Sequence, residues 1–174
     1  MKKGEKGQVW VETVTYTLIA LVLIGLVLSF AKPKIEELQD KSITEQSIQM
    51  LKEVDLVIKE VGEGVTGNTR KIETNLKKGS IKIDAANDTI IFEMKSRYLY
   101  SQPKQEYQEG ALTIYTSEDG KYYPITITLN YSKNYNITYN SLENQKIISK
   151  SSTPYEVFIS KKGGTSNQIN IEIN

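Results

Sequence analysis

The pattern of hydrophobic and polar residues changes twice along the chain. Residues 13–31 carry no charge, and as a helix they would extend roughly 28 Å, close to the ~30 Å hydrocarbon thickness of a bilayer. From 33 to 61, apolar residues recur every three or four positions and charged residues occupy the other positions, which is typical of an amphipathic helix. We therefore predict one long helix over 8–61, with Pro33 inside it.

Residues 69–174 show the alternation of apolar and polar side chains that is typical of half-buried strands. The pair Asp119-Gly120 predicts a tight hairpin turn. We expect seven to nine short strands, with candidates at 81–84, 90–95, 112–114, 125–130, 135–139, 145–149, 155–161 and 168–173. The predicted fold class is α+β, with a long N-terminal helix (stem) followed by an antiparallel β-sandwich-like domain.

The segment between the helix and the strands, 62–68, reads GEGVTGN. Its glycines predict the end of the helix and a hinge to the β domain. Gly62, Gly64 and Gly67 also fit the pattern G-x-G-x-x-G, but a dinucleotide site requires a strand before this pattern and a helix after it. The predicted order is the reverse, so we reject a nucleotide site.

Composition excludes several function classes. The 174 residues have a formal net charge of +1 and no clustered basic stripe, so nucleic acid is not an expected partner. Cysteine and histidine are both absent, which removes thiolate chemistry, the usual general base and the commonest metal ligand. The closely spaced carboxylates fall at predicted turns. We predict no enzyme activity, no catalytic residue, no cofactor and no metal site.

The N-terminal segment allows three interpretations. In the first, cleavage after Ala31, two positions after the small residue Ser29, would give a soluble secreted protein. Against this interpretation, the apolar run is longer than the ~7–15 residues of a removable signal. Three basic residues at the start, Lys2, Lys3 and Lys6, favour a cytoplasmic N-terminus. A single-span anchor that displays a ligand- or cell-binding surface domain, without polymerisation, is the second interpretation.

The third interpretation rests on two features of the sequence. The pair Gly7-Gln8 precedes the apolar run, and Glu12 would be the fifth residue of the chain that remains after cleavage between Gly7 and Gln8. With the basic leader and the apolar helix, this arrangement resembles archaeal type IV pilin-like proteins with a class III signal peptide. Trp10 departs from the family pattern, which has a small serine between the glutamine and the glutamate. The resemblance implies that a membrane prepilin peptidase removes residues 1–7 and that Glu12 pairs with the N-terminal amine of a neighbouring subunit.

The same resemblance implies a function. The chain would be a structural subunit of an archaeal type IV pilus-like cell-surface filament, and its β domain would determine adhesion or other surface properties. Its partners would be copies of itself in a helical filament, the prepilin peptidase and the pilus assembly machinery. The precursor would be inserted in the cell membrane before it enters the extracellular filament. Gly25 and Ser29 form a small-xxx-small pair that permits close helix approach.

Three sequons offer candidate N-glycosylation sites in an exported domain, at Asn87, Asn130 and Asn136. Alternation with neighbouring apolar residues places Asn130 and Asn136 on the polar face of their strands. Ten of the eleven tyrosines lie in the β region. They either form a contact surface or, as tyrosines in strands commonly do, occupy half-buried positions.

Overall fold

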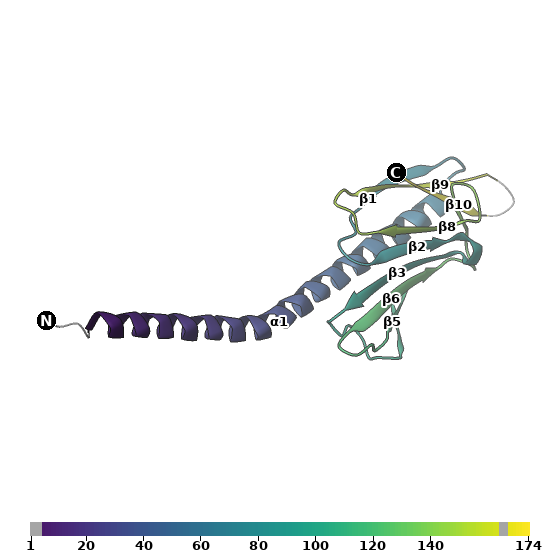
Figure 1. Cartoon of the computed structure of the whole chain (residues 1–174). Coiled ribbons are helices and arrows are strands. Elements are labelled where there is room, and N and C mark those ends of the chain that lie inside the picture. The colour runs from purple at the N-terminus through teal and green to yellow at the C-terminus, as the bar shows by residue number, and fades with distance from the viewer. Residues whose placement is uncertain (1–4, 164–166) are drawn as a thin grey trace. The chain divides into compact units, whose positions relative to one another are not determined.

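The computed structural model describes residues 5–163 and 167–174, with side chains from Val9 onward. Helix α1 (Glu5–Glu63) comes first and contains Pro33, which bears out the predicted long helix (Figure 1). Two compact units divide the chain, one ending at Leu38 and the other beginning at Gln39. The second unit holds the C-terminal part of α1 and every described strand.

Ten strands and a short 3₁₀ helix follow α1 in the described part of the chain. They are β1 (Thr69–Thr74), β2 (Ser80–Asp84), η1 (Ala85–Asn87), β3 (Thr89–Ser96), β4 (Glu106–Glu109), β5 (Leu112–Thr116), β6 (Tyr123–Asn130), β7 (Asn136–Tyr139), β8 (Gln145–Ser149), β9 (Tyr155–Lys161) and β10 (Gln168–Ile173). This arrangement confirms the α+β class.

The strands form two sheets that pack together. Sheet A has the order β1-β9-β10-β7, and sheet B has the order β4-β5-β6-β3-β2-β8. Every pairing is antiparallel except that of β7 with β10, which is parallel. The expectation of seven to nine strands was too low by one, because β1 and β4 show little apolar alternation. Both are edge strands, where polar side chains are normal and discourage pairing with other chains.

The predicted hairpin is confirmed between β5 and β6, but its tight turn lies one residue later than expected. Asp119 and Tyr122 exchange backbone hydrogen bonds of 2.9 and 3.0 Å, so the two central residues are Gly120 and Lys121. Gly120 has φ of +61°, a conformation that glycine adopts at no steric cost.

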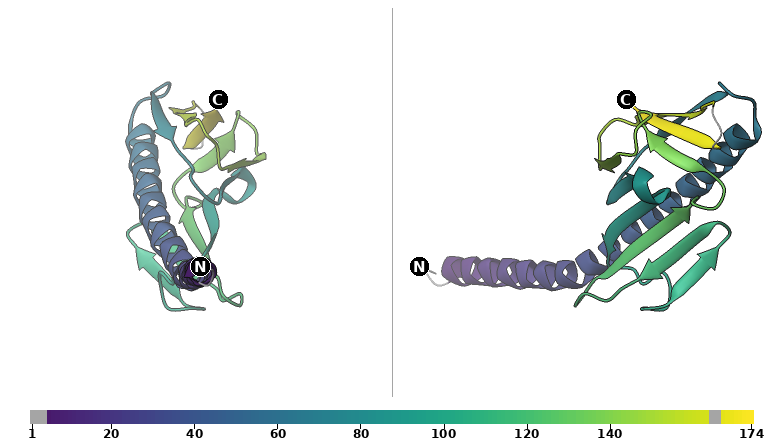
Figure 2. Two further views of the ribbon diagram at one scale, coloured as in Figure 1. Left: turned by 60° about the vertical axis from the view of Figure 1, so that its left-hand side comes forward. Right: turned by 90° about the vertical axis from the view of Figure 1, so that its right-hand side faces the viewer.

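The core forms where the C-terminal part of α1 meets both sheets (Figure 2). Leu51, Ile58 and Val61 of the helix have no exposed surface, and burial of such a side chain stabilises the fold by about 1.5–3 kcal/mol. Leu51 lies with Ile83 of sheet B and Ile171 of sheet A around one small apolar cavity. The second half of the helix is therefore an integral part of the β domain.

This packing corrects the hinge predicted at 62–68. The boundary between the compact units falls instead between Leu38 and Gln39. Gly62 is buried, and the Lys161 ammonium donates hydrogen bonds to the carbonyl oxygens of Gly62 and Gly64 at 2.5 and 3.0 Å. Glycines suggested flexibility, but these bonds hold the segment against β9.

Candidate functional site: the N-terminal helix

The first part of α1 presents an apolar surface with no partner among the described residues. Every side chain from Val9 to Phe30 is exposed, including Trp10 at 70% and Leu18 at 58%. By length and composition, α1 is the one helix in the described part of the chain that could cross a membrane. An apolar surface of this extent requires lipid or another apolar surface to cover it.

Four hydroxyls within this apolar surface are satisfied locally. The hydroxyls of Thr13, Thr15 and Thr17 donate to the backbone carbonyl oxygens four residues earlier, at 2.8–2.9 Å. The Ser29 hydroxyl donates to the Leu26 carbonyl oxygen at 2.7 Å. These four hydroxyls consequently need no water when the helix surface enters an apolar environment.

Glu12 is the charged residue within the exposed segment 9–30. Its carboxylate makes no hydrogen bond or ion pair with the side chains that the structure describes. A carboxylate in an apolar environment is stable only when it is neutralised or paired. Glu12 therefore needs either neutralisation or a cationic partner from outside the described residues if this helix becomes covered.

The predicted cleavage site, Gly7-Gln8, lies in the backbone of α1. The side chain of Gln8 and residues 1–4 of the leader lie outside the described residues. Gly25 faces open space, because a Cβ at this position would have no atom within 4 Å apart from its own stretch of the helix backbone. Ser29 is exposed one turn later. The small pair is thus available for a close contact with another helix.

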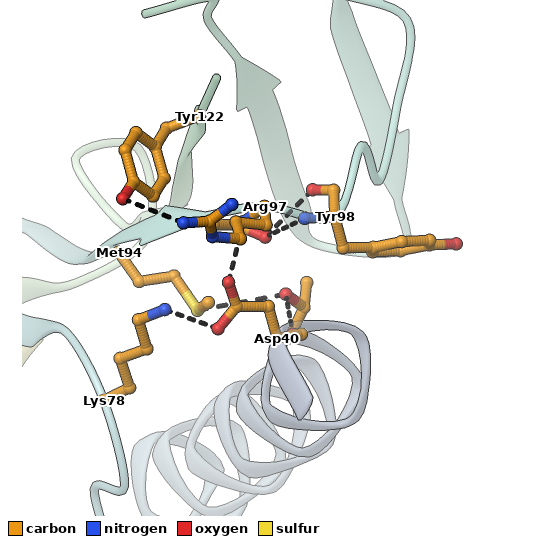
Figure 3. Close-up of polar contacts among 8 residues, drawn as sticks. Asp40, Lys78, Met94, Arg97, Tyr98 and Tyr122 are labelled. Carbon is orange, nitrogen blue, oxygen red and sulfur yellow. Dashed lines mark hydrogen bonds and ion pairs between the residues drawn. The ribbon is translucent and has the colours of Figure 1, made fainter. Parts of the chain in front are cut away.

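A buried carboxylate that sequence reasoning missed holds the second unit's helical segment against sheet B. Asp40 is 4% exposed, and its Oδ2 accepts a hydrogen bond of 2.7 Å from the backbone N–H of Arg97 (Figure 3). Its Oδ1 pairs with the ammonium of Lys78. One turn later, the Thr44 hydroxyl lies 3.8 Å from the Met94 sulfur.

The surroundings of Arg97 extend this cluster to the hairpin turn. Its guanidinium donates to the Tyr122 hydroxyl at 3.4 Å and lies 5.1 Å from the centre of the Tyr122 ring. The Lys95 ammonium lies 4.7 Å from the same ring and 2.5 Å from Asp119. The residues that surround Asp40 are far apart in the sequence, which is why periodicity alone could not reveal them.

Two tyrosines make further links between the helix and the sheets. The Tyr131 hydroxyl donates to the Asp55 carboxylate at 3.2 Å, and burial, together with that carboxylate, raises the pKa of the phenol. The Tyr100 hydroxyl donates to Glu109 at 2.7 Å, and Glu109 pairs with Lys52 of α1 at 2.6 Å. The hydrogen bond from Lys52 lowers the pKa of Glu109, and Tyr100 adds to this effect. Tyr131 is buried and Tyr100 is half-buried, and both lie outside the strands, so their role is structural without being the predicted half-buried strand position.

The three sequons differ in their surroundings. Asn130 is exposed at the end of β6, and its Oδ1 accepts hydrogen bonds from the Ser132 hydroxyl at 2.8 Å and the Ser132 N–H at 3.0 Å. Asn87, in η1, is also exposed, and it adds to the effect of Lys82 in lowering the pKa of the Asp84 carboxyl. Asn136 is half-buried in β7, with an Oδ1 that is buried and unpaired among the described residues.

The hydroxyl of the third sequon is also inaccessible, since Thr138 is 2% exposed and lies 3.1 Å from the Asn170 Oδ1. The polar-face prediction is therefore accurate for Asn130, whereas the parallel pairing of β7 with β10 partly buries Asn136. The rejected glycine pattern begins with Gly62 in the last turn of α1 and ends before β1, so a helix precedes it and a strand follows it, which agrees with the rejection.

Comparison with protein-family models, curated proteins and solved structures gave no significant match. The interpretation of the N-terminal part of α1 consequently rests on its exposed apolar surface, the single charge of segment 9–30 and the fold that follows it.

Proposed function

We propose that the chain is a structural subunit of an archaeal type IV pilus-like surface filament, assembled through the N-terminal part of α1. The observation that carries the proposal is the exposed apolar surface from Val9 to Phe30, whose one charged residue, Glu12, has no described partner. Copies of this helix packed together would cover the apolar surface. The amine created by cleavage before Gln8 would supply the missing cation.

The energetics favour a paired Glu12 in such a core. At about 4 Å and an effective dielectric constant near 20, a carboxylate and an ammonium attract each other by roughly 4 kcal/mol before desolvation. An unpaired carboxylate in the same environment would be strongly unfavourable. Pairing between neighbouring copies would therefore also favour one stagger between them.

The second unit suits the exported part of such a subunit. It has a core formed by the helix and both sheets, in a chain without cysteine, so its stability does not depend on an oxidising compartment. The filament would display this unit to solvent, where it would determine adhesion or other surface properties. Its role would be structural, without catalytic turnover.

A single-span anchored surface domain remains the alternative, favoured by the internally satisfied hydroxyls of the apolar segment. Those hydroxyls suit lipid as well as a helical core. Under this alternative, the helix stays in the membrane and the second unit binds a ligand or a neighbouring cell.

N-terminal mass spectrometry of the protein from its native cells is the first test, followed by electron microscopy of material sheared from the cell surface. The proposal predicts a chain that begins at Gln8 and filaments that contain it. An uncleaved start or a start at Lys32 would refute the filament. Cleavage at Gln8 without filaments would favour the anchored domain.

A further inference from the structure

One end of sheet B is strongly basic. The strand registers bring four loops together at this end, because β3 ends where β2 and β6 begin, and β5 ends where β4 begins. We call these loops the basic end: 75–79, 97–105, 117–122 and 150–154. They contain six cationic residues, namely Lys77, Lys78, Arg97, Lys104, Lys121 and Lys150, and two carboxylates, Glu118 and Asp119.

The opposite end of the sheet has a different charge. The loops there, 85–88, 110–111, 131–135 and 140–144, contain one cation, Lys133, and two carboxylates, Asp88 and Glu143. The loops of the basic end carry four more cations than carboxylates, or three more when Asp40 of α1, which binds Lys78, is included. The loops of the opposite end, which we call the distal end, carry one more carboxylate than cations. With a formal charge of +1 over the whole chain, this asymmetry indicates an oriented interaction with a negatively charged partner.

Internal ion pairs leave much of this positive charge available. Lys77, Lys121 and Lys150 are exposed, and none of them forms an ion pair with the residues that the structure describes. Glu118 is 3.4 Å from Lys104, and Asp119 is paired with Lys95 of β3. The two carboxylates of the basic end therefore do not compensate these three lysines.

The basic end also carries side chains that suit the boundary between water and lipid. Leu99 is 41% exposed, between the half-buried rings of Tyr98 and Tyr100. Tyr122 stands on the other side of the cluster in Figure 3, in contact with the Arg97 guanidinium. Tyrosine and basic residues are enriched at the headgroup level of membranes, where an apolar body and a polar tip are both accommodated.

Chain connectivity keeps the basic end within reach of a bilayer that holds the apolar run. Gln39, the first residue of the second unit, follows Ala31 by eight residues, a helical rise of about 12 Å. The next residue, Asp40, is bound to Lys78 and to the Arg97 backbone, and both of these residues belong to the basic end.

We propose that the basic end docks on anionic lipid headgroups of the membrane that holds the precursor. Docking would orient the second unit before assembly, with the distal end directed away from the lipid. The proposal rests on membrane insertion of α1, which the filament and the single-span anchor share, and it does not depend on polymerisation.

The test uses the full chain reconstituted in vesicles with a small fraction of headgroup-nitroxide lipid as a quencher. Because the chain has no cysteine, a fluorophore can be attached at one introduced site. Leu99→Cys places it in the basic end, and Leu142→Cys, at a leucine 57% exposed in a distal loop, is the matched control. Vesicles of phosphatidylcholine alone are compared with vesicles containing about 30 mol % phosphatidylglycerol.

We expect quenching at Leu99→Cys to exceed that at Leu142→Cys several-fold in the anionic vesicles. The excess should disappear without phosphatidylglycerol and in about 0.5 M salt, where screening is strong. On the Leu99→Cys background, Lys121→Glu should reduce it more than Lys133→Glu, although both change the charge by the same amount. Equal quenching at the two sites, or an excess that persists in phosphatidylcholine alone, would overturn the proposal.

The outcome is separable from that of the filament. A failed docking test would leave cleavage before Gln8 and filament formation unaffected. Docking by a chain that forms no filaments would support the lipid contact and count against the proposed filament function.

Discussion

The Oδ2 of Asp40 accepts a 2.7 Å hydrogen bond from the backbone N–H of Arg97, a residue 57 positions later in the chain. The Lys78 ammonium binds the other oxygen of the same carboxylate. One buried helical side chain thus fixes both the loop before β2 and the loop after β3. We expect this contact to determine whether the first turns of the second unit's helical segment stay attached to sheet B.

Replacement of Asp40 should be the most destabilising polar substitution on the helix. Asp40→Ala removes the acceptor for Arg97 and the partner of Lys78. Because the Lys78 side chain is 40% exposed and can be solvated, the main cost is the backbone N–H of Arg97 left without an acceptor, about 1–3 kcal/mol. Denaturant unfolding of the full chain in detergent, followed by tyrosine near-UV circular dichroism, measures the loss. Glu53→Ala is the control, because Glu53 is exposed on the same helix. Equal effects of the two substitutions would contradict the assigned role.

Tyr131→Phe should lower the free energy of unfolding by about 1–2 kcal/mol, since it leaves the Asp55 carboxylate without its phenol donor. Tyr107→Phe is the matched control, because Tyr107 is 48% exposed and loses only a solvated hydroxyl. The same denaturant titration compares the variants. A Tyr131→Phe protein as stable as the Tyr107→Phe protein would show that the hydrogen bond contributes nothing.

The raised pKa of Tyr131 also predicts an alkaline limit. The folded phenol resists ionisation because it is buried beside Asp55, whereas an unfolded tyrosine ionises near pH 10. The stability that this group contributes is therefore present below about pH 10 and is lost as the pH rises further. Unfolding titrations across that range should show a steeper decline for the wild type than for Tyr131→Phe.

An acid limit follows from Glu109. The Lys52 ammonium and the Tyr100 hydroxyl lower the pKa of this carboxyl in the folded state. Its contribution is present above the ordinary pKa of 4.5 and is lost as the pH falls through the folded value. Glu109→Gln should flatten the decline in stability below pH 4.5, with Glu106→Gln, on the same strand, as the control. An unchanged acid profile would exclude Glu109 as a contributor.

For the proposed filament, Glu12→Ala should leave cleavage before Gln8 largely intact and sharply reduce the yield of sheared filaments. Glu12→Gln separates charge from shape, because it keeps the size of the side chain and removes the carboxylate. Mass spectrometry measures processing, and electron microscopy measures assembly. A normal filament yield from both variants would rule out pairing between Glu12 and a neighbouring amine.

If the exported chain is N-glycosylated, we expect the modification at Asn130 rather than Asn136. Asn130 is exposed, and its side chain is oriented by Ser132, whereas the Thr138 hydroxyl of the other sequon is buried. Glycopeptide mass spectrometry of native protein checks the assignment. Asn130→Gln should remove the glycan mass, and Asn136→Gln should not. Modification of Asn136 in the folded protein would contradict this expectation.

The sequence by itself determined the elements whose cause is local. Continuous apolarity and then helical periodicity specified a single helix through Pro33, and alternation specified β8, β9 and β10 with the bounds that the structure shows. Glu12 and the cleavage pair, Gly7-Gln8, are also features of sequence position, and their functions remain predictions.

Only the tertiary structure decided which parts of the chain belong together. The glycines at 62–68 gave no indication that Lys161 would bind their carbonyl oxygens. Nor did the amphipathic pattern reveal that Asp40 is buried, because its partners come from loops that meet only after both sheets form. Local pattern records which face of an element is apolar, whereas the pairing of distant charges depends on strand order and register, which no single segment contains.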